Sequence, residues 1–251
     1  MELSEKTIII TGASSGIGAA AALLFAAEGA NLVLGARRQA ELDRVAGQIE
    51  QSAGHARVLA GDVTEQSYNS ALVELALAEF GGLDGAFNNA GVMGDTGPVP
   101  DMDSANWDRV IATNLTSAFF AAKAQIPALT ERSGGALAFT SSFVGYSNGG
   151  MPGMAAYGAA KAGLIGLVQS LAIDHAADGI RVNALLPGGT MTAMAGDDPG
   201  VHAFIAGLHP MKRLAVPREI AQAALFLLSD RASFVTGGPL IADGGVSVRL
   251  V

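Results

Sequence analysis

The chain has 251 residues, of which 50% are hydrophobic and 15% are charged, and it contains no cysteine. This length suits one large hydrophobic core, and the lack of cysteine excludes a disulfide framework, thiolate zinc sites and a cysteine nucleophile. The 15 lysines and arginines against 23 aspartates and glutamates give a formal net charge of -8, which argues against nonspecific nucleic-acid binding.

Short apolar runs alternate with longer helical stretches along the chain. Continuous apolar runs bounded by Gly, Asn, Asp or Pro are typical of buried parallel strands, and helices between them indicate right-handed crossovers. We expect seven strands, at 7–10, 31–35, 56–60, 83–88, 135–140, 180–186 and 239–242. The helices are expected at 16–28, 39–52, 65–80, 104–131 (broken near Thr113), 155–177 and 217–229. This order predicts an α/β fold, a doubly wound Rossmann-type parallel sheet with helices on both faces.

We expect a single domain over residues 1–251, since no repeat, low-complexity tract or linker divides the chain. The segment 188–212 is rich in Gly and Met and has no clean period. Long irregular segments in compact domains are more often functional than decorative, so we predict a substrate lid at about 190–212.

We expect the apolar stretches to be too short to cross a membrane, because "TIII" breaks at Thr11 and "AAAALLFAA" stops before Glu28. A spanning helix needs roughly 20 apolar residues, and the N-terminus lacks the length and cleavage site of a signal peptide. We expect a cytoplasmic protein with no membrane and no nucleic-acid partner.

"TGASSGIG" at 11–18 follows the first strand and opens the first helix. Gly12, Gly16 and Gly18 permit a tight turn and let backbone N–H groups and the positive helix end approach a pyrophosphate. Its place between a strand and a helix therefore predicts phosphate binding, although glycine clusters also arise by chance in a chain with 33 glycines.

Tyr157 and Lys161 are four residues apart, so in a helix they share one face. A phenol has a pKa near 10 and is a poor base at neutral pH unless a nearby cation stabilises the phenolate. Lys161 is such a cation, and the alternative is a chance pair on an amphipathic helix.

These motifs resemble the classical short-chain dehydrogenase/reductase family over essentially the whole chain. The loop at 11–18 is similar to its cofactor loop, "NNAG" at 88–91 to its fourth-strand motif, and "PGGTMT" at 187–192 to its nicotinamide-side loop. The resemblance implies the following cofactor-binding residues: Gly12, Ser14, Ser15, Gly16, Ile17, Gly18, Arg37, Arg38, Asp62, Val63, Asn89, Ala90, Gly91, Tyr157, Lys161, Pro187, Gly188, Thr190 and Thr192.

The resemblance also implies a catalytic tetrad of Asn114, Ser142, Tyr157 and Lys161. Tyr157 would transfer the proton to or from the substrate oxygen, and Lys161 would also hold the nicotinamide ribose. Ser142 would hold the carbonyl oxygen, and Asn114 would kink its helix and place a water against Lys161. The family's Ser-x-x-Gly pattern matches "SFVG" and selects Ser142 over Ser141, although the interval to Tyr157 is about two residues longer than in many members.

Two of the implied cofactor contacts have simpler readings. Asp62 follows the third strand, where its carboxylate can accept from an adenine amino group, but it can also cap a helix together with Thr64. Asn88 and Asn89 are also common turn formers; the resemblance favours structural and cofactor-edge roles for this segment.

The end of the second strand bears on cofactor choice. The family's acidic position, which accepts from the ribose 2′-hydroxyl in NAD-dependent members, falls on Ala36, and Arg37 and Arg38 follow it. Arginine supplies a bidentate donor to a 2′-phosphate, so NADP(H) is favoured over NAD(H). Against this, Ser15 stands where many NADP-preferring members carry a basic residue, and both arginines could merely begin a solvated helix with Glu41.

No metal site is expected, because the histidines at 55, 175, 202 and 209 show no ligand spacing and are expected on the surface or in loops. A Ser-His-Asp hydrolase is also excluded, since no Gly-x-Ser-x-Gly elbow follows a strand. The pocket walls are expected at 144–154 and 192–211, and their composition suggests an apolar cavity. The large apolar and aromatic residues in or beside these two segments are Phe143, Tyr146, Met151, Met154, Met191, Met194 and Phe204.

The resulting hypothesis is an NAD(P)(H)-dependent oxidoreductase that interconverts a secondary alcohol and a ketone, with a hydrophobic small-molecule substrate. A dinucleotide-binding regulatory protein and a dehydratase or epimerase on the same scaffold are the alternatives. The helix at 155–177 is apolar around much of its circumference, and members of the resembled family usually form tetramers, so we expect a homotetramer.

Overall fold

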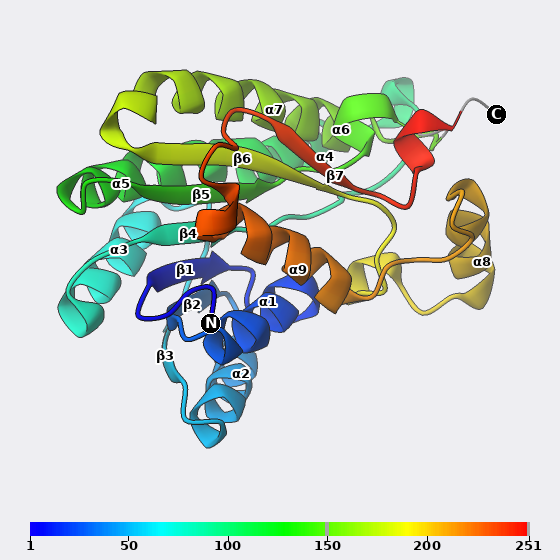
Figure 1. Ribbon diagram of the computed structural model, residues 1–251. Coiled ribbons are helices and arrows are strands. Elements are labelled where there is room, and N and C mark those ends of the chain that lie inside the picture. The colour runs from blue at the N-terminus through cyan, green and yellow to red at the C-terminus, as the bar shows by residue number, and fades with distance from the viewer. Residues whose placement is uncertain (149–150, 250–251) are drawn as a thin grey trace.

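A computed structural model describes residues 1–148 and 151–249. Seven parallel strands form one sheet in the order β3-β2-β1-β4-β5-β6-β7 (Figure 1). The strands are β1 Thr7–Thr11, β2 Asn31–Ala36, β3 His55–Ala60, β4 Gly85–Asn88, β5 Gly135–Thr140, β6 Ile180–Pro187 and β7 Pro239–Ala242. The reversal of order beside β1 makes the sheet doubly wound, as the alternation of apolar runs and helices predicts.

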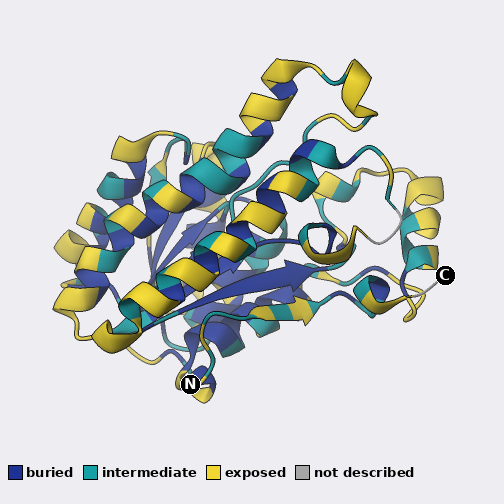
Figure 2. Ribbon diagram, turned by 90° about the horizontal axis from the view of Figure 1, so that it is seen from above, coloured by how far each residue is buried: buried dark blue, intermediate teal, exposed yellow. Residues whose placement is uncertain are grey.

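Helices cover both faces of the sheet. The α-helices are α1 Gly16–Ala27, α2 Gln39–Gln51, α3 Gln66–Phe80, α4 Ser104–Ile111, α5 Ser117–Glu131, α6 Val144–Ser147, α7 Ala155–His175, α8 Pro199–Leu208 and α9 Pro217–Leu228. One core joins α1, α2 and α9 to the sheet, and a second core joins α3, α5 and α7 to the opposite face. Most residues of the inner strands are buried (Figure 2), which explains the continuous apolar runs of the strands.

The expected break near Thr113 is confirmed as a π-helical turn over Ala112–Thr116 between α4 and α5. Asn114 lies buried in this turn, and its side-chain amide donates to the carbonyls of Val110 (3.0 Å) and Val92 (2.8 Å). Competition by a side chain for backbone carbonyls is a common cause of an irregular helical turn.

The segment 188–212 contains more regular structure than its sequence indicates. A 3-10 turn covers Ala193–Ala195, and α8 follows. Asp198 begins α8, because its Oδ1 accepts from the amides of Gly200 (2.7 Å) and Val201 (3.4 Å). α8 buries no residue fully, and it projects from the side of the molecule (Figure 1). α8 contacts the rest of the protein through few side chains, among them Ile205 and Leu208. Its sequence therefore shows no clear core-facing stripe.

One helix contradicts the expectation that no apolar stretch reaches spanning length. The helical stretch Ala155–Asp178 covers 24 residues and contains an 18-residue window with a mean hydropathy of 1.3, so its length and composition would suffice. α7 nevertheless packs on the sheet through Leu164, Val168 and Ala172 and is a core helix. A helix that packs on a core with one face and carries small residues on the other can be apolar around its whole circumference.

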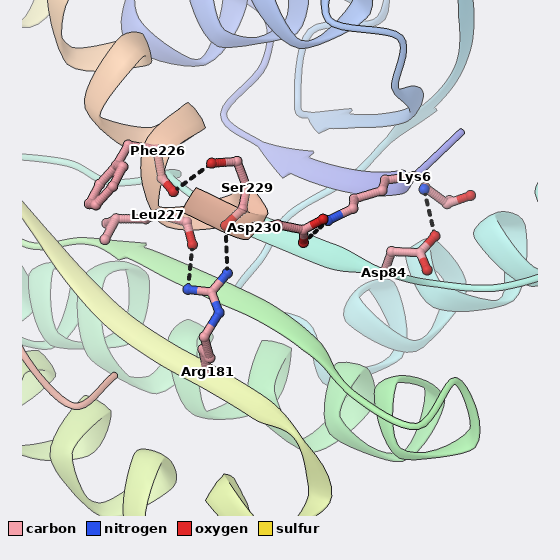
Figure 3. A network of polar contacts seen from close by, with 8 residues as sticks. Lys6, Asp84, Arg181, Phe226, Leu227, Ser229 and Asp230 are labelled. Carbon is pink, nitrogen blue, oxygen red and sulfur yellow. Dashed lines mark hydrogen bonds and ion pairs between the residues drawn. The ribbon is translucent and has the colours of Figure 1, made fainter. Parts of the chain in front are cut away.

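The amino ends of the strands are closed by a polar network (Figure 3). Arg181, at the start of β6, donates to the carbonyls of Leu227 (2.8 Å) and Ser229 (3.1 Å) and so caps the last turn of α9. Lys6 pairs with Asp230 just beyond that turn. This network covers the amino ends of the strands. A ligand-binding site is therefore expected at their carboxyl ends, where open α/β sheets bind ligands.

Candidate active site

A cleft of about 650 Å³ lies along the carboxyl ends of the strands. All the predicted site residues line it except Gly18 and Asn114. Gly18 lies beneath the glycine loop, and Asn114 lies behind Gly91, where a Cβ added to Gly91 would come within 2.7 Å of its Oδ1. The fold therefore brings together residues that are as far apart in the chain as Gly12 and Thr192.

The glycine loop has the backbone that a tight turn under a pyrophosphate requires. Gly12 and Gly16 have φ of 68° and 56°, a region that side chains disfavour. A Cβ at Gly18 would lie 2.3 Å from the Gly12 carbonyl oxygen, so only glycine lets α1 approach β1 this closely. Ser15 precedes α1 and its side chain does not cap the helix, which leaves the first-turn N–H groups for a ligand.

The loop after β2 distinguishes two arginines that the sequence treats alike. Arg38 donates to the hydroxyls of Ser14 (3.1 Å) and Ser15 (2.9 Å) in the glycine loop. Arg37 is on the side of Asp62, whose carboxylate it helps to stabilise. The arginine held against the glycine loop is thus Arg38, and Ala36 at the end of β2 leaves no carboxylate opposite it.

Asp62 forms a turn and does not cap a helix. Its Oδ1 accepts from the backbone amide (2.9 Å) and the hydroxyl (2.8 Å) of Thr64, whereas α3 begins later, after Glu65. The backbone amide of Thr64 is the main reason that the pKa of Asp62 lies below its usual value. A carboxylate held ionised at the edge of the cleft remains able to accept from a ligand.

The "NNAG" segment ties β4 to its neighbours. Asn88 exchanges two hydrogen bonds with the buried amide of Gln125, at 2.8 and 2.9 Å. The amides of Asn89 and Ala90 both donate to the Thr11 hydroxyl, at 3.0 and 3.1 Å. These contacts fix the cleft floor between β1 and β4, so the asparagines are more than turn formers.

Lys161 is buried at the bottom of the cleft, with 2% of its surface exposed. Its Nζ donates to the Thr140 carbonyl at the end of β5, at 2.7 Å. Burial lowers the pKa of Lys161 to about 7, because no carboxylate in the described part of the chain pairs with it and desolvation disfavours its charge.

Tyr157 lies one turn before Lys161, and the lysine Nζ is 5.6 Å from the centroid of its ring. Burial raises the pKa of the Tyr157 phenol, and a hydrogen bond with Ser142 offsets part of the rise. In the free cleft the effect of burial is larger than that of the Ser142 hydrogen bond, so the pKa of the phenol lies above its usual value.

The two serines after β5 point to different partners. Ser141 donates its hydroxyl hydrogen to the Lys161 carbonyl at 2.8 Å and so fastens α7 to the sheet. The Ser142 oxygen accepts from the Val144 amide at 3.2 Å and lies near the Tyr157 phenol. Ser142 is the serine that remains available to the cleft.

The far end of the cleft is apolar. The described lining residues there are Met93, Thr96, Phe143, Val144, Met151, Pro152, Met154, Met194, Val201, Phe204 and Ile205. Two expected wall residues, Tyr146 and Met191, do not line it and are largely exposed. Met93 and Thr96 were missed, although their position directly after the β4 motif was a usable signal.

The doubly wound sheet, the glycine loop beneath the cleft and the Tyr157–Lys161 pair on its floor define a protein of the dinucleotide-binding α/β class. A family model described as enoyl-(acyl carrier protein) reductase matches residues 12–247. A 2,5-dichloro-2,5-cyclohexadiene-1,4-diol dehydrogenase of Sphingobium indicum is 40% identical over 251 residues, which cover 97% of this chain and 98% of that protein. Cyclohexanol dehydrogenase of Acinetobacter sp. is 37% identical over 248 residues, covering 99% and 97% respectively.

The crystal structure of a short-chain type dehydrogenase/reductase from Mycobacterium marinum has a TM-score of 0.94 at 31% identity, and the match covers 99% of this chain and 98% of that chain. The chain belongs to the short-chain dehydrogenase/reductase family of oxidoreductases.

Proposed function

We propose that the protein interconverts a neutral secondary alcohol and a ketone by hydride exchange with NADP(H), and that Tyr157 moves the proton. The observation that carries this proposal is the pairing of Tyr157 with buried Lys161 on one face of α7, in the same cleft as the glycine loop. The names of the relatives, which are dehydrogenases of cyclic alcohols, support it.

The described residues fit a dinucleotide. A Cβ at Gly12 would come within 2.9 Å of Asn89, and one at Gly16 within 3.1 Å of Thr192, so the glycines keep open a cradle between these two side chains. In this proposal the glycine loop holds the pyrophosphate, Asp62 the adenine, and Thr190 with Thr192 the nicotinamide side. When bound, the cofactor supplies or accepts the hydride.

The protein's own contribution is proton transfer and orientation. Ser142 and Tyr157 would both hydrogen-bond the substrate oxygen, and the Tyr157 hydroxyl would donate its proton as a ketone is reduced. In alcohol oxidation the phenolate is needed, and burial alone opposes it. A protonated Lys161 beside a positively charged ligand would offset that burial, which is why the pair must work in the loaded cleft.

The substrate proposal rests on charge and shape. The charged side chains among the described lining residues are Arg37, Arg38, Asp62 and Lys161. The first three follow β2 and β3, at the other end of the sheet from the apolar wall near Tyr157. An apolar wall rich in methionine favours a neutral alicyclic alcohol or ketone.

The decisive test follows the absorbance of reduced nicotinamide with purified protein. We expect turnover of cyclohexanol and cyclohexanone, and a lower kcat/KM for an acetoacetyl thioester. Tight dinucleotide binding without turnover of any alcohol or ketone in a panel would favour a regulatory binding protein. Product formation without net change in nicotinamide absorbance would favour a dehydratase or epimerase.

Cofactor preference provides a sharper prediction. Charge-assisted contacts contribute about 1.5–3 kcal/mol each, so we expect kcat/KM to be roughly tenfold or more higher with NADPH than with NADH. Arg38→Asp should reverse the order, because it removes the donor held by Ser14 and Ser15. Arg44→Asp, on the exposed face of α2, is the matched control and should leave the ratio unchanged. Equal efficiency with both cofactors in the unaltered protein would contradict the prediction.

The lid is a second prediction. Two contacts with Ala215 anchor the amino-terminal end of the lid. Thr190 forms a strand-like bridge with Ala215, and the Met191 amide donates to the Ala215 carbonyl at 2.9 Å. Between there and residue 208, Val201 and Phe204 face the cleft yet stay largely exposed. The lid is expected over about 190–212, and contacts at its two ends, at Met191 and His209, narrow the mobile part to 192–208. Amides at 192–208 should exchange hydrogen quickly in the free protein and slowly with cofactor plus a substrate analogue. Equal protection in both states would mean a preformed wall.

Assembly is a third prediction. The exposed side of α7 carries small residues, Ile173 is 80% exposed near its end, and Phe234 before β7 is fully exposed. Gly237, three residues after Phe234, lies against Ala172, the residue before Ile173. The exposed side chains of Ile173 and Phe234 therefore belong to neighbouring segments. Exposed apolar groups of this size commonly mark an interface. Light scattering should return a tetramer; a monomer mass near 25.3 kDa would contradict this.

A further inference from the structure

His209 is expected on the surface or in a loop, and the structure places it in a loop but not on the surface. It directly follows α8, yet only 2% of its surface is exposed. Its ring packs edge-on to Phe143, with the ring centroids 6.3 Å apart. A buried imidazole that packs on Phe143 and lies at the end of α8 has no part in the mechanism proposed above.

Both ring nitrogens of His209 have backbone partners. The Gly189 amide donates to Nε2 at 2.9 Å, and Nδ1 lies 2.7 Å from the Ile205 carbonyl oxygen. An amide can only donate and a carbonyl can only accept, so Nδ1 must carry the hydrogen and Nε2 the lone pair. The contacts select the neutral Nδ1–H form, because an imidazolium would direct a second N–H at the Gly189 amide.

The backbone on the cofactor side is shaped to admit this ring. A Cβ at Gly188 would lie 2.7 Å from Nε2, and a Cβ at Gly189 would lie 3.0 Å from Cε1 and 2.5 Å from the Ile205 side chain. Gly188 and Gly189 therefore allow close approach of the imidazole, in addition to any role in holding a ligand. The ring occupies the space between the loop after β6 and the last turn of α8.

We propose that neutral His209 is a positioning residue that fastens the nicotinamide-side loop to the end of the lid helix. Through Gly189 it holds Thr190, whose hydroxyl bonds the Gly188 carbonyl at 3.0 Å and which lines the cleft. Through Ile205 it holds the turn of α8 that carries Phe204. The His209 ring thereby links closure of the lid to the position of the nicotinamide-side loop. This inference rests on the proposed function.

Amide variants separate the two bonds. His209→Gln places an acceptor near the Nε2 position and can keep the Gly189 bond, whereas His209→Asn places a donor near Nδ1 and keeps the Ile205 bond alone. With the nicotinamide cofactor that the unaltered protein binds more tightly, calorimetry should give about tenfold weaker binding for His209→Asn and a change of less than about threefold for His209→Gln. The KM for that cofactor should follow, with kcat changed less than KM. His55→Asn, at the start of β3, is the control and should match the unaltered protein.

A role in filling space alone gives a different result. It predicts that the Gln and Asn variants lose cofactor affinity equally, in step with their thermal unfolding midpoints, and that outcome would overturn the proposal. Failure of the unaltered protein to bind either cofactor would instead contradict the proposed function.

Nitrogen-15 NMR of the unaltered protein gives a measurement that needs no variant at position 209. The His209 ring, identified by removing the other three histidines one at a time, should show the neutral Nδ1–H form at pH 7.5. Its Nε2 resonance and the Gly189 amide should shift when cofactor is added. An Nε2–H form, an imidazolium, or no shift in a protein that binds cofactor would also overturn the proposal.

Discussion

Tyr157→Phe should reduce turnover by roughly 10²–10⁴-fold, the usual contribution of a positioned acid–base group. The ring and its packing against Lys161 remain, and only the phenolic proton is lost. Cofactor affinity should therefore stay within about threefold of that of the unaltered protein, well below one tenfold step of 1.4 kcal/mol. Steady-state kinetics with cyclohexanone and calorimetry with the cofactor measure the two effects separately.

Tyr146→Phe is a close control for this experiment. Tyr146 belongs to α6, is 57% exposed and does not line the cleft. Loss of its hydroxyl should leave kcat and KM nearly unchanged. Retention of more than roughly a tenth of the activity in Tyr157→Phe would remove Tyr157 as the proton-transfer group, since water alone rarely replaces a positioned acid so well.

Lys161→Met should abolish activity and at the same time stabilise the fold near neutral pH. Burial lowers the pKa of Lys161 from 10.5 to about 7. This difference means that, at acidic pH, the charged Lys161 destabilises the native state by roughly 4–5 kcal/mol through its desolvation. Methionine fills similar space without a charge but leaves the Thr140 carbonyl unpartnered, at a cost of about 1–3 kcal/mol. We therefore expect a net gain of about 1–4 kcal/mol in the free energy of unfolding at pH 6.

The sign of the pH dependence follows from proton binding. Between about pH 7 and 10.5 the unfolded chain holds a proton on Lys161 that the native protein has released. Stability of the unaltered protein should rise through this window relative to the variant, so the advantage of Lys161→Met should shrink as pH increases.

Urea unfolding at several pH values measures this difference directly. Lys123→Met, on the exposed face of α5, should show no comparable pH-dependent difference. A Lys161→Met variant that is less stable than the unaltered protein at pH 6 would show that the buried lysine has compensation beyond the Thr140 bond.

The sequence was most informative where one element carries its own pattern. The strand runs such as "TIII" are buried on both faces, and that requirement is visible as an unbroken apolar stretch. The spacing of Tyr157 and Lys161 likewise depends only on the pitch of one helix. The π-helical turn at Asn114 coincides with the expected break near Thr113.

Contacts between segments that are far apart in the chain could not be predicted from the sequence pattern of one element. Arg37 and Arg38 are adjacent in sequence, and only the path of the chain after β2 brings Arg38 to Ser14 and Ser15. The lowered pKa of Lys161 depends on how completely the surrounding elements cover it. No described residue of α8 is fully buried, so its sequence lacks the periodic stripe that marks a core helix.

By itself, then, the sequence determined the seven-stranded doubly wound sheet, the glycine loop and the residues that would share a cleft, because secondary structure and short motifs are encoded by neighbours along the chain. Tertiary structure decided which arginine contacts the glycine loop, which way desolvation moves the pKa of Tyr157 and Lys161, and the burial of His209. Each of these depends on the distance and solvent exposure of groups far apart in the sequence, and such quantities exist only once the chain has packed.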